Sequence, residues 1–570
     1  MKNTQVLQGL NLLSTSSIVI IKIEKKEEVE KLLKQISSYH QLFLDSYHFD
    51  QDKLSIETPI PLIWEEASPH IQKLSKGDIT YKECKAKVVD DLINQRLASM
   101  STIPVLYSAH RQQKEITPTI ISNYNSSNKT DNHSKGFNRY YTLGCGKGSQ
   151  VIYSISSSKD SKTAKQIQRD KWSTNMMMES LGLPIPKWEL LNEKTDIDKI
   201  WDSYTKPVVV KPTGLAGGNG VVLGIQTKEQ CKKAFDFAQK AVNTYPRSEW
   251  QKKIMIQEQV QGEDYRLLVI DGKFEVGTKR IPAFVTGDGK KSIKELIEEE
   301  NKDPKRDLSN PSHTLKPIMI DDSLLDYLKE QKLSLKDIPE KGQKIQLRKV
   351  ASMSQGGITE DVTDSVGAEI KYIAESIAES IHAFTLGVDV LCKDITKPLT
   401  KENGAILEVN TMPEVYLNIF PVIGRERTEV IDTYVSKLLS EGNAKRIVVI
   451  GNPSTDIPTM LKRKSLFWSY LKQDDTVGEY RDKELRINGL TINRELKKEV
   501  ALKALKINAS LDAIVFHHRD WDEVEETGLG FSKIDLLIVT KDMKKDKRFN
   551  QMLKYRLKGF ISKIKVIRTN

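Results

Sequence analysis

The residues of this chain that are best suited to chemistry lie in two short segments far apart in the sequence. Lys211 precedes a glycine-rich loop, and Glu408 and Asn410 end an apolar run. Glycines leave backbone N–H groups free to approach an anion, so the loop could cradle the β- and γ-phosphates of a nucleotide. A carboxylate and an amide supply oxygen ligands that suit Mg²⁺. Together the segments indicate ATP that activates a carboxylate, with the phosphates on Gly217, Gly218 and Gly220.

The glycine loop alone is weak evidence, because an ordinary hairpin also uses Gly-Gly-Asn-Gly. Its pattern is neither a Walker A motif nor a Rossmann fingerprint. The run that follows, Ile254–Val260, reads as a strand whose main chain could contact the edge of adenine. Gly262, Asp264 and a strand over 265–270 that carries Arg266 come directly after it. Strand, hinge, turn and strand in this order suit a nucleotide pocket.

Several elements must position these residues. Asp170 and Lys171 open an expected helix that runs to Leu183, and Pro207–Lys211 reads as a buried strand with one lysine at its end. In the expected strand 404–410, period-two alternation places Glu408 and Asn410 on one face. Asp394, on the adjacent strand, completes the expected metal set. The alternative is a polar strand edge, but two polar groups on an apolar strand are poorly tolerated without a partner.

Three arginines, Arg266, Arg280 and Arg348, could supply cations for phosphates or for a substrate carboxylate. A surface ion pair is the alternative for each of them taken singly.

The motifs resemble, in order, the ATP-grasp half of cyanophycin synthetase over residues 160 to 440. The resemblance rests on Asp170-Lys171, Lys211-Pro212, Gln257-Glu258-Gln259-Val260, Asp264-Tyr265-Arg266, Arg280-Ile281-Pro282-Ala283 with Gly287-Asp288-Gly289, Ser354-Gln355-Gly356-Gly357 and Glu408-Val409-Asn410.

This resemblance implies a role for each matched position. Lys171 and Lys211 would contact ATP phosphates, Glu258 and Val260 would hold adenine, and Asp264 would belong to the same nucleotide site. Asp394, Glu408 and Asn410 would ligate Mg²⁺. Arg266 and Arg280 would be catalytic and would face the acceptor carboxylate together with Arg348 and Ser354. In such enzymes the carboxylate attacks the γ-phosphate, and an amine displaces the resulting acyl phosphate.

The chain departs from that family in three places. Its loop reads Ala216-Gly217-Gly218-Asn219-Gly220 where the family has Asn-His-Gly-Arg-Gly, and bulky residues and an acid, Glu414, follow Asn410. Both differences indicate different substrates. The last segment resembles the Mur-ligase-like half of the family, but its turn after Gly451 has no lysine for phosphates. We expect it to be a shortened, ATP-inactive scaffold or oligomer contact.

Composition sets the remaining expectations. At 570 residues, of which 38% are hydrophobic, the chain should form an α/β protein of three domains. We expect an N-terminal domain over 1–160, an ATP-grasp domain over 161–442 with a lid at 280–360, and a Mur-ligase-like domain over 443–570. Four scattered cysteines favour reduced thiols in the cytoplasm. The net charge of +11 is spread over the chain, which favours neither nucleic acid nor membrane as a partner.

These observations predict a carboxylate–amine ligase that uses ATP and Mg²⁺ on small-molecule or peptide substrates, as a homo-oligomer. Two alternatives stay open at this point: a nucleotide-binding scaffold without turnover, and a basic nucleic-acid binder.

Overall fold

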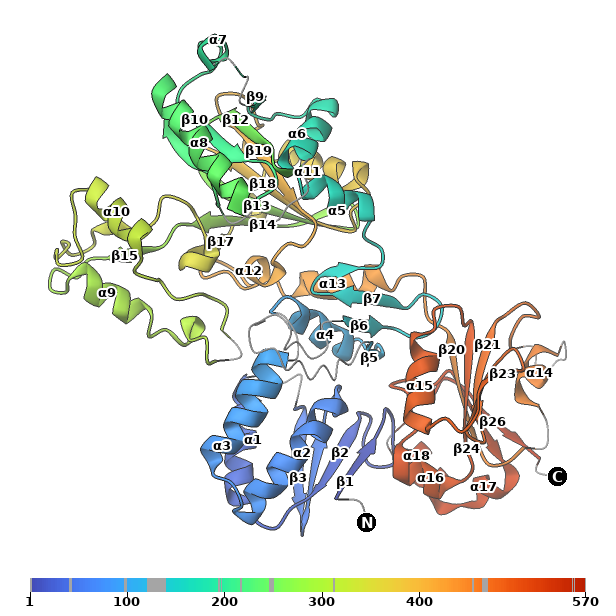
Figure 1. Cartoon of the computed structure of the whole chain (residues 1–570). Coiled ribbons are helices and arrows are strands. Elements are labelled where there is room, and N and C mark those ends of the chain that lie inside the picture. The colour runs from blue at the N-terminus through green and yellow to red at the C-terminus, as the bar shows by residue number, and fades with distance from the viewer. Residues whose placement is uncertain are drawn as a thin grey trace. The chain divides into compact units, whose positions relative to one another are not determined.

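The chain folds into a mixed α/β protein, as the sequence predicts (Figure 1). The structure is a computed structural model that describes residues 3–39, 44–96, 100–119, 140–192, 195, 197–215, 218–244, 251–310, 313–453, 456–463, 470–555, 557 and 559–568. Its Cα positions group into two compact units. The first contains Met1–Ser154, Ser309–Ser312 and Ile431–Asn570, and the second contains Ile155–Leu308 and His313–Val430. The expected domain boundaries stay predictions.

The first unit combines both ends of the chain. A four-stranded sheet has the order β1 (Thr4–Leu7), β2 (Ile18–Lys22), β4 (Lys53–Glu57), β3 (Ser46–Asp50), with α2 (Pro61–Lys76) packed on it and α1 (Glu27–Tyr39) packed on α2. Further elements are α3 (Tyr81–Lys85), η2 (Ala86–Arg96), α4 (Thr102–Arg111), β5 (Ile116–Pro118), β6 (Tyr140–Leu143) and β7 (Gln150–Tyr153).

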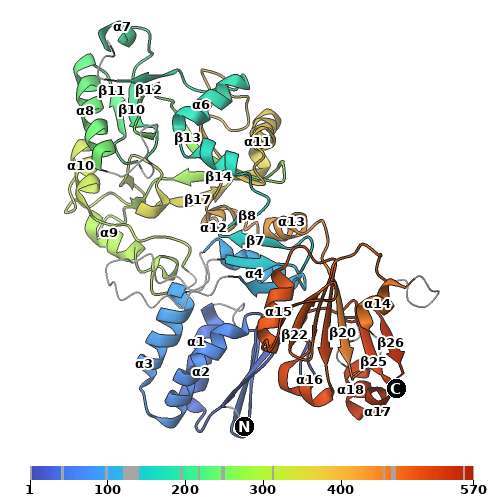
Figure 2. The same cartoon turned by 45° about the vertical axis from the view of Figure 1, so that its right-hand side comes forward.

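The C-terminal part of this unit is built on a seven-stranded sheet (Figure 2). Its order is β23 (Leu490–Asn493), β22 (Glu484–Ile487), β21 (Val477–Arg481), β24 (Ala513–His518), β20 (Lys445–Ile450), β25 (Leu536–Thr540), β26 (Ile564–Ile567). The last five of these pair in parallel. The helices are α13 (Glu429–Leu438), α14 (Ile457–Lys462), α15 (Lys498–Ile507), α16 (Trp521–Thr527), α17 (Lys541–Lys545) and α18 (Lys547–Tyr555).

The two ends of the chain share one hydrophobic core in this unit. Leu10 and Cys145 are buried in the same cluster as Phe516 and Phe531. The amide of Leu10 also donates to the Phe531 carbonyl at 2.8 Å. The C-terminal segment therefore folds together with the N-terminal region around this shared core.

The second unit contains a four-stranded sheet in the order β11 (Val222–Ile225), β10 (Val208–Pro212), β12 (Ile254–Glu258), β9 (Trp188–Leu191). Helix α8 (Lys228–Thr244) covers one of its faces, where Val208, Val210, Ile254 and Ile256 form a core with α8 alanines. Side chains alternate along a strand, so Lys211 and Gln257 lie on the opposite face. The short helix α7 (Ile197–Trp201) packs beside α8.

A five-stranded sheet of the same unit has the order β17 (Ile358–Asp361), β14 (Lys273–Ile281), β13 (Glu263–Ile270), β18 (Thr385–Cys392), β19 (Gly404–Asn410). Tyr265, Leu267, Val388 and Val390 alternate onto the face that packs against α11 (Ala368–Ser380). The residues between them, among them Asp264, Arg266 and Asp389, share the other face. That face is polar, and it carries the candidate site.

Two helices precede the first of these sheets, and one follows the second. They are α5 (Lys162–Gln168), α6 (Lys171–Ser180) and α12 (Val415–Ile419). The expected helix at Asp170 is present, and the Asp170 side chain accepts a hydrogen bond from the Ser173 amide as its N-cap. It ends at Ser180 rather than at Leu183, because Gly182 takes a left-handed conformation with φ of +68°.

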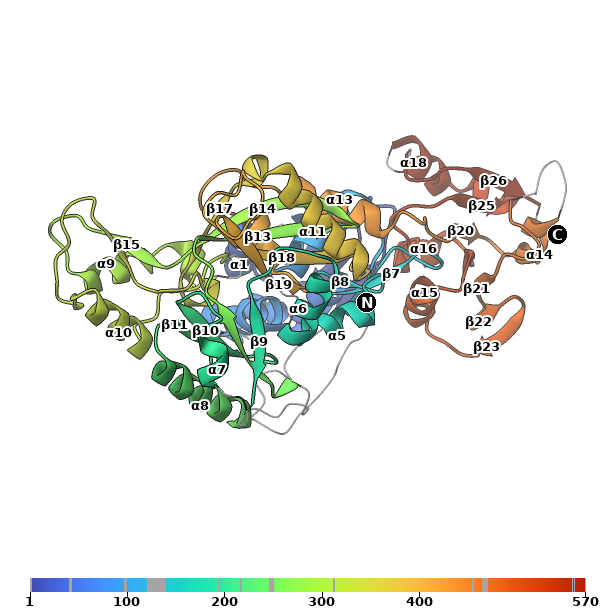
Figure 3. The same ribbon diagram turned by 90° about the horizontal axis from the view of Figure 1, so that it is seen from above.

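A smaller region with its own core lies between β14 and β17 in the sequence (Figure 3). It consists of β15 (Phe284–Thr286), α9 (Ile293–Glu300), α10 (Asp322–Glu330) and β16 (Lys344–Gln346). This region is where the sequence predicts a lid.

Two general expectations can be compared with the structure. The cysteines Cys84, Cys145, Cys231 and Cys392 are free and buried. Among the described residues, none of the helices is long and apolar enough to cross a membrane.

Candidate active site

The glycine-rich loop leaves the end of β10 and is held at its base. The Thr213 amide donates to the Lys253 carbonyl at 2.8 Å, and the Lys171 amide donates to the Thr213 carbonyl at 3.0 Å. Gly220 has φ of +73°, and a Cβ there would lie 2.8 Å from Cγ of Pro212, so this position requires glycine. Gly218 also has positive φ, at +77°, and open space around it. Gly217 lies outside the described residues.

Two lysines and one carboxylate meet beside this loop. Lys171 begins α6, and its Nζ donates to the Leu215 carbonyl at 2.7 Å and lies 3.8 Å from Oε2 of Glu408. Burial, with a smaller contribution from the charge of Lys171, lowers the pKa of Lys211 to about 8, although Glu408 opposes the change. The structure thus brings together Lys171, Lys211 and Glu408. An excess of positive charge beside a glycine loop suits a polyphosphate.

Asp389 is the centre of the polar face of the five-stranded sheet. Its side chain is 3% exposed and accepts from Arg266 Nε at 2.7 Å and from Arg266 Nη2 at 2.8 Å. Arg280 Nη2 donates to the same carboxylate at 3.0 Å. Burial raises the pKa of Asp389, but Arg266 and Arg280 lower it more, so the group stays ionised. The two arginines are therefore held in fixed orientations by one buried carboxylate.

Asp264 is the second carboxylate on this face. It accepts from Arg280 Nε at 2.8 Å and from Nη2 at 2.5 Å. Burial and the charge of Asp389 together raise the pKa of Asp264 to about 6, although Arg280 opposes the rise. In this structure Asp264 orients Arg280, whereas the sequence analysis assigned it to the nucleotide. The contact with a nucleotide stays a prediction.

The expected metal ligands do not all come together. In the antiparallel pairing of β18 and β19, Asp389 lies opposite Glu408 and Gly387 lies opposite Asn410. Asp394 lies past the other end of β18, where its amide donates to the Asn403 side chain. Its carboxylate accepts from the Thr396 amide at 3.0 Å and from the Thr396 hydroxyl at 2.6 Å. The structure therefore does not place Asp394 with Glu408 and Asn410.

Asp389 occupies the place that the sequence analysis assigned to Asp394. Asn410 Nδ2 lies 3.5 Å from Oδ2 of Asp389, so these side chains share one patch with Glu408. The feature of the sequence that could have identified Asp389 is an acidic residue inside the apolar run Val388–Cys392. In the described part of the chain, no group of three or more His, Cys, Asp or Glu side chains could hold a metal ion. Two carboxylates and one amide still offer the hard oxygen donors that Mg²⁺ takes.

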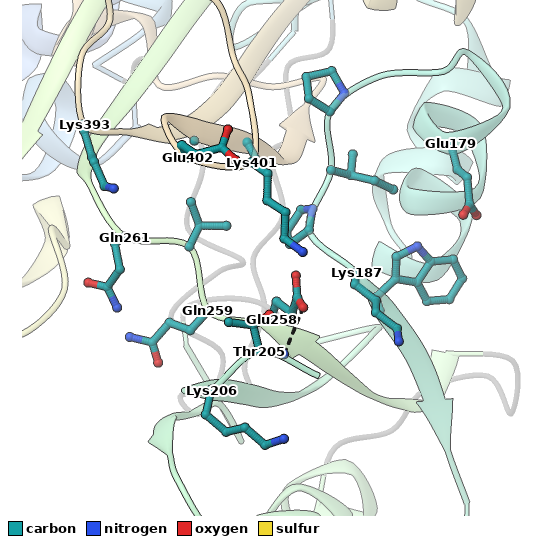
Figure 4. Close-up of a pocket in the computed structure, with 17 residues that line it drawn as sticks. Glu179, Lys187, Thr205, Lys206, Glu258, Gln259, Gln261, Lys393, Lys401 and Glu402 are labelled. Atoms are coloured by element: carbon teal, nitrogen blue, oxygen red, sulfur yellow. Dashed lines mark hydrogen bonds between the residues drawn. The ribbon is translucent and has the colours of Figure 1, made fainter. Parts of the chain in front are cut away.

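The expected adenine residues lie at a cavity of about 700 Å³ (Figure 4). Its lining comes from the hinge after β12, the segment before β9 and the turn between β18 and β19, and it includes Glu258, Val260, Lys187 and Lys401. The Glu258 carboxylate accepts from the Thr205 amide at 3.0 Å, and its own amide donates to the Lys187 carbonyl at 2.9 Å. The Glu258 carboxylate and amide are thus both engaged by neighbouring segments, and contact between the hinge and a base stays a prediction.

The expected substrate residues of the lid lie in different environments. Arg348 is 3% exposed, and it binds Asp321 at 2.6 and 2.9 Å and the Met319 carbonyl at 2.8 Å. In this conformation its guanidinium makes its hydrogen bonds within the lid. Ser354 is exposed, and its hydroxyl lies 3.0 Å from that of Ser352. Its contact with a substrate stays a prediction.

The turn after β20 is the segment in which the sequence analysis expects a phosphate loop that has lost its lysine. Arg481 Nη2 lies 3.1 Å from both Oδ1 of Asn452 and the Pro453 carbonyl. An arginine therefore anchors the start of this turn, while Ser454 and Thr455 lie outside the described residues. The inactivity of this segment stays a prediction.

Comparison with known proteins defines the class of the central region. Residues 169–281 match the family model for the ATP-grasp (A) domain of phosphoribosylglycinamide synthetase. This region, which contains Lys171, Lys211 and Arg266, is an ATP-grasp domain.

More specifically, the protein is similar to cyanophycin synthetase. It is 32% identical to that of Geminocystis herdmanii over 322 residues, which are 56% of this chain and 36% of the relative. It is also 31% identical to the glutathione biosynthesis bifunctional protein GshAB of Clostridium perfringens, over 49% of this chain and 36% of the relative. A solved bifunctional glutathione synthetase from Pasteurella multocida aligns over 65% of this chain and 47% of its own at 24% identity and a TM-score of 0.45. The chain thus covers about a third of the length of the curated relatives that it matches.

Proposed function

We propose that this protein is an ATP-dependent carboxylate–amine ligase that forms an amide through an acyl phosphate and releases ADP and phosphate. The observation that carries the proposal is the meeting of Lys171 and Glu408 at 3.8 Å, with Asp389 paired opposite Glu408. This contact joins a cationic phosphate site to a face that carries two oriented arginines. A triphosphate and a carboxylate can therefore approach each other in one place.

Each group has a definite task in this reaction. Lys171, Lys211 and the glycine loop bind the phosphates of ATP. Glu408, Asn410 and Asp389 would hold Mg²⁺, which when bound would neutralise charge on the phosphates. We replace Asp394 by Asp389 in this set because Asp389 lies opposite Glu408.

The arginines act on the second substrate. Arg266 donates to Asp389 through Nε and Nη2. Arg280 donates to Asp264 through Nε and Nη2, and its Nη2 also donates to Asp389. Within the described residues the Nη1 groups of both arginines have no hydrogen-bond partner. They can bind the acceptor carboxylate and stabilise its negative charge as it becomes an acyl phosphate. An uncharged amine then attacks the acyl carbon, the acyl C–O bond to phosphate breaks, and the nitrogen passes its extra proton to the departing phosphate as the amide forms.

The substrates and the setting are proposed more broadly. The names of the relatives, a cyanophycin synthetase and a glutathione biosynthesis protein, support a synthetic reaction in this chain too. We propose that it joins an amino acid or small amine to a peptide or amino-acid carboxylate, in the cytoplasm and as a homo-oligomer. The C-terminal segment serves as an ATP-inactive support, which agrees with the core that it shares with Leu10 and Cys145.

The test is substrate-dependent phosphate release. Purified protein is incubated with ATP, Mg²⁺ and pools of amino acids, small amines and short peptides, and ADP and phosphate are followed. We expect release to need a carboxylate and an amine together, with a product heavier than either. ATP binding without stimulated release across the panel would instead support a nucleotide-binding scaffold without turnover.

A further inference from the structure

The amine substrate has no binding group in the site described so far, although it must reach the acyl carbon beside the arginines. In the proposed reaction the acceptor is held through its carboxylate and ATP through its phosphates. The nitrogen that attacks is uncharged, so the site has to recognise the amine through its other groups. The chain that follows Asn410, at the end of β19, offers a group that can do so.

The segment after Asn410 lies against the face that carries the arginines. Gly387 of β18 pairs with Asn410. A Cβ at Gly387 would lie 3.1 Å from Cβ of Pro413 and 3.4 Å from Cδ of Arg266. Pro413 and Arg266 therefore flank the same point of β18. The residue that follows Pro413 is Glu414, which is thus a close neighbour of the proposed acceptor site.

The main chain of Glu414 is fixed, whereas its carboxylate is free to bind a ligand. The Glu414 carbonyl accepts from the Leu417 amide at 3.0 Å and from Asn418 Nδ2 at 3.4 Å. Glu414 is the N-cap of α12, but its side chain makes no capping hydrogen bond. It is exposed, and within the described residues its carboxylate has no ion-pair partner. Burial raises the pKa of Tyr416, and the charge of Glu414 adds to the rise, so an aromatic side chain lies near this carboxylate.

The other carboxylates of this face already have cations. Asp361 belongs to the face, because it pairs with Thr278, which itself pairs with Arg266. The ion pairs join Asp264 and Asp389 to the two arginines, Glu408 to Lys171, and Asp361 to Arg427. Among the described carboxylates on this face and directly beside it, Glu414 is therefore the one without a cation. A positively charged group of a ligand would supply it.

We propose that Glu414 is a specificity residue that binds a second, positively charged group of the amine substrate. This inference rests on the proposed function, because it needs an acyl phosphate beside Arg266 and Arg280. The substrate class that it names is an amine with a separate cationic group, such as an aliphatic diamine or a basic amino acid. One nitrogen of such a molecule attacks in its uncharged form, while the other stays charged and donates to the carboxylate.

The experiment compares matched amines in ADP formation by the purified full chain. ATP, Mg²⁺ and a fixed pool of N-acetylated amino acids and dipeptides are present, so that only the added amine can attack. Diaminopentane is compared with pentylamine, and lysine with norleucine, because the second member of each pair is similar in length and lacks the extra cation. We expect the wild type to use the cationic member with a kcat/KM at least about tenfold higher, the effect of one charge-assisted hydrogen bond.

Two variants and a control assign this preference to Glu414. Glu414→Gln keeps the size of the side chain and removes its charge. It should lose about tenfold in kcat/KM with diaminopentane and lysine, mainly through a higher KM, and should use pentylamine and norleucine as the wild type does. Glu414→Lys should reverse the preference, so that glutamate is used better than lysine. Glu369→Gln, which alters an exposed glutamate of α11, is the matched control and should keep the wild-type preference.

Three results would overturn the inference and leave the proposed function standing. The first is equal use of both members of each pair by the wild type. The second is an unchanged preference in Glu414→Gln, which would place the recognition of the cation elsewhere. The third is an equal loss with all amines in Glu414→Gln, which would indicate a purely structural role. A wild type that forms no ADP with any of the amines would defeat the proposed function itself.

Discussion

We predict that Lys211 destabilises the nucleotide-free protein, because its ammonium group is buried at the proposed phosphate site. Burial holds its pKa at about 8, well below its ordinary value of 10.5, with a further contribution from Lys171. This difference means that the protein holds the ammonium at a cost of ~3 kcal/mol near neutral pH. The variant Lys211→Met keeps an apolar stem of similar length and removes the charge.

The expected result is a more stable protein that binds ATP less well. At pH 7 the ammonium is present in both folded and unfolded states, so Lys211→Met should gain ~3 kcal/mol in free energy of unfolding. Between pH 8 and 10.5 the folded wild type releases its proton first, so the unfolded state binds more protons and wild-type stability rises with pH. The gain of the variant should therefore shrink to ~1.4 kcal/mol at about pH 9.5.

The assay is urea unfolding of both proteins at these two pH values, with calorimetric ATP binding at pH 7. Loss of one charge-assisted contact should weaken ATP binding about 10- to 100-fold. Lys233→Met, which alters an exposed lysine of α8, is the matched control and should change neither stability nor binding. The reasoning fails if Lys211→Met is less stable than the wild type at pH 7, or if its gain is the same at both pH values.

Three further predictions follow from the contacts of the site and of the first unit. Glu408→Gln should keep the fold and lose most ADP formation, because it weakens a carboxylate ligand beside Lys171; near-normal rates would place the metal elsewhere. Asp389→Asn should abolish turnover whereas Asp394→Asn should leave it within about twofold, since only Asp389 lies opposite Glu408; the reverse order in a steady-state assay would restore Asp394 to the metal set. Glu115→Gln should lower the free energy of unfolding by ~3 kcal/mol, because it leaves buried Lys506, now 2.8 Å away, without its carboxylate; an unchanged thermal midpoint would contradict this.

The sequence determined most of the elements and the chemical type of the site. The strands at Val208–Pro212, Ile254–Glu258 and Gly404–Asn410 follow from short apolar runs, and the start of α6 follows from a capping aspartate before Lys171. These signals are local, since they depend only on side-chain periodicity and on neighbouring residues. The grouping of Lys171, Lys211 and Glu408 was also expected, because the order of the motifs resembles that of a known family.

Only the tertiary structure decided which carboxylate lies opposite Glu408 and which partner Arg348 binds. A register shift between Asp389 and Val390, and the length of the turn after β18, place Asp389 opposite Glu408 and leave Asp394 at the far end of the hairpin. Similarly, Arg348 binds Asp321 in a lid that folds around its own core, and its contact with a substrate stays a prediction. Strand register and hairpin length bring distant residues together, and neither is encoded in the periodicity of a single segment.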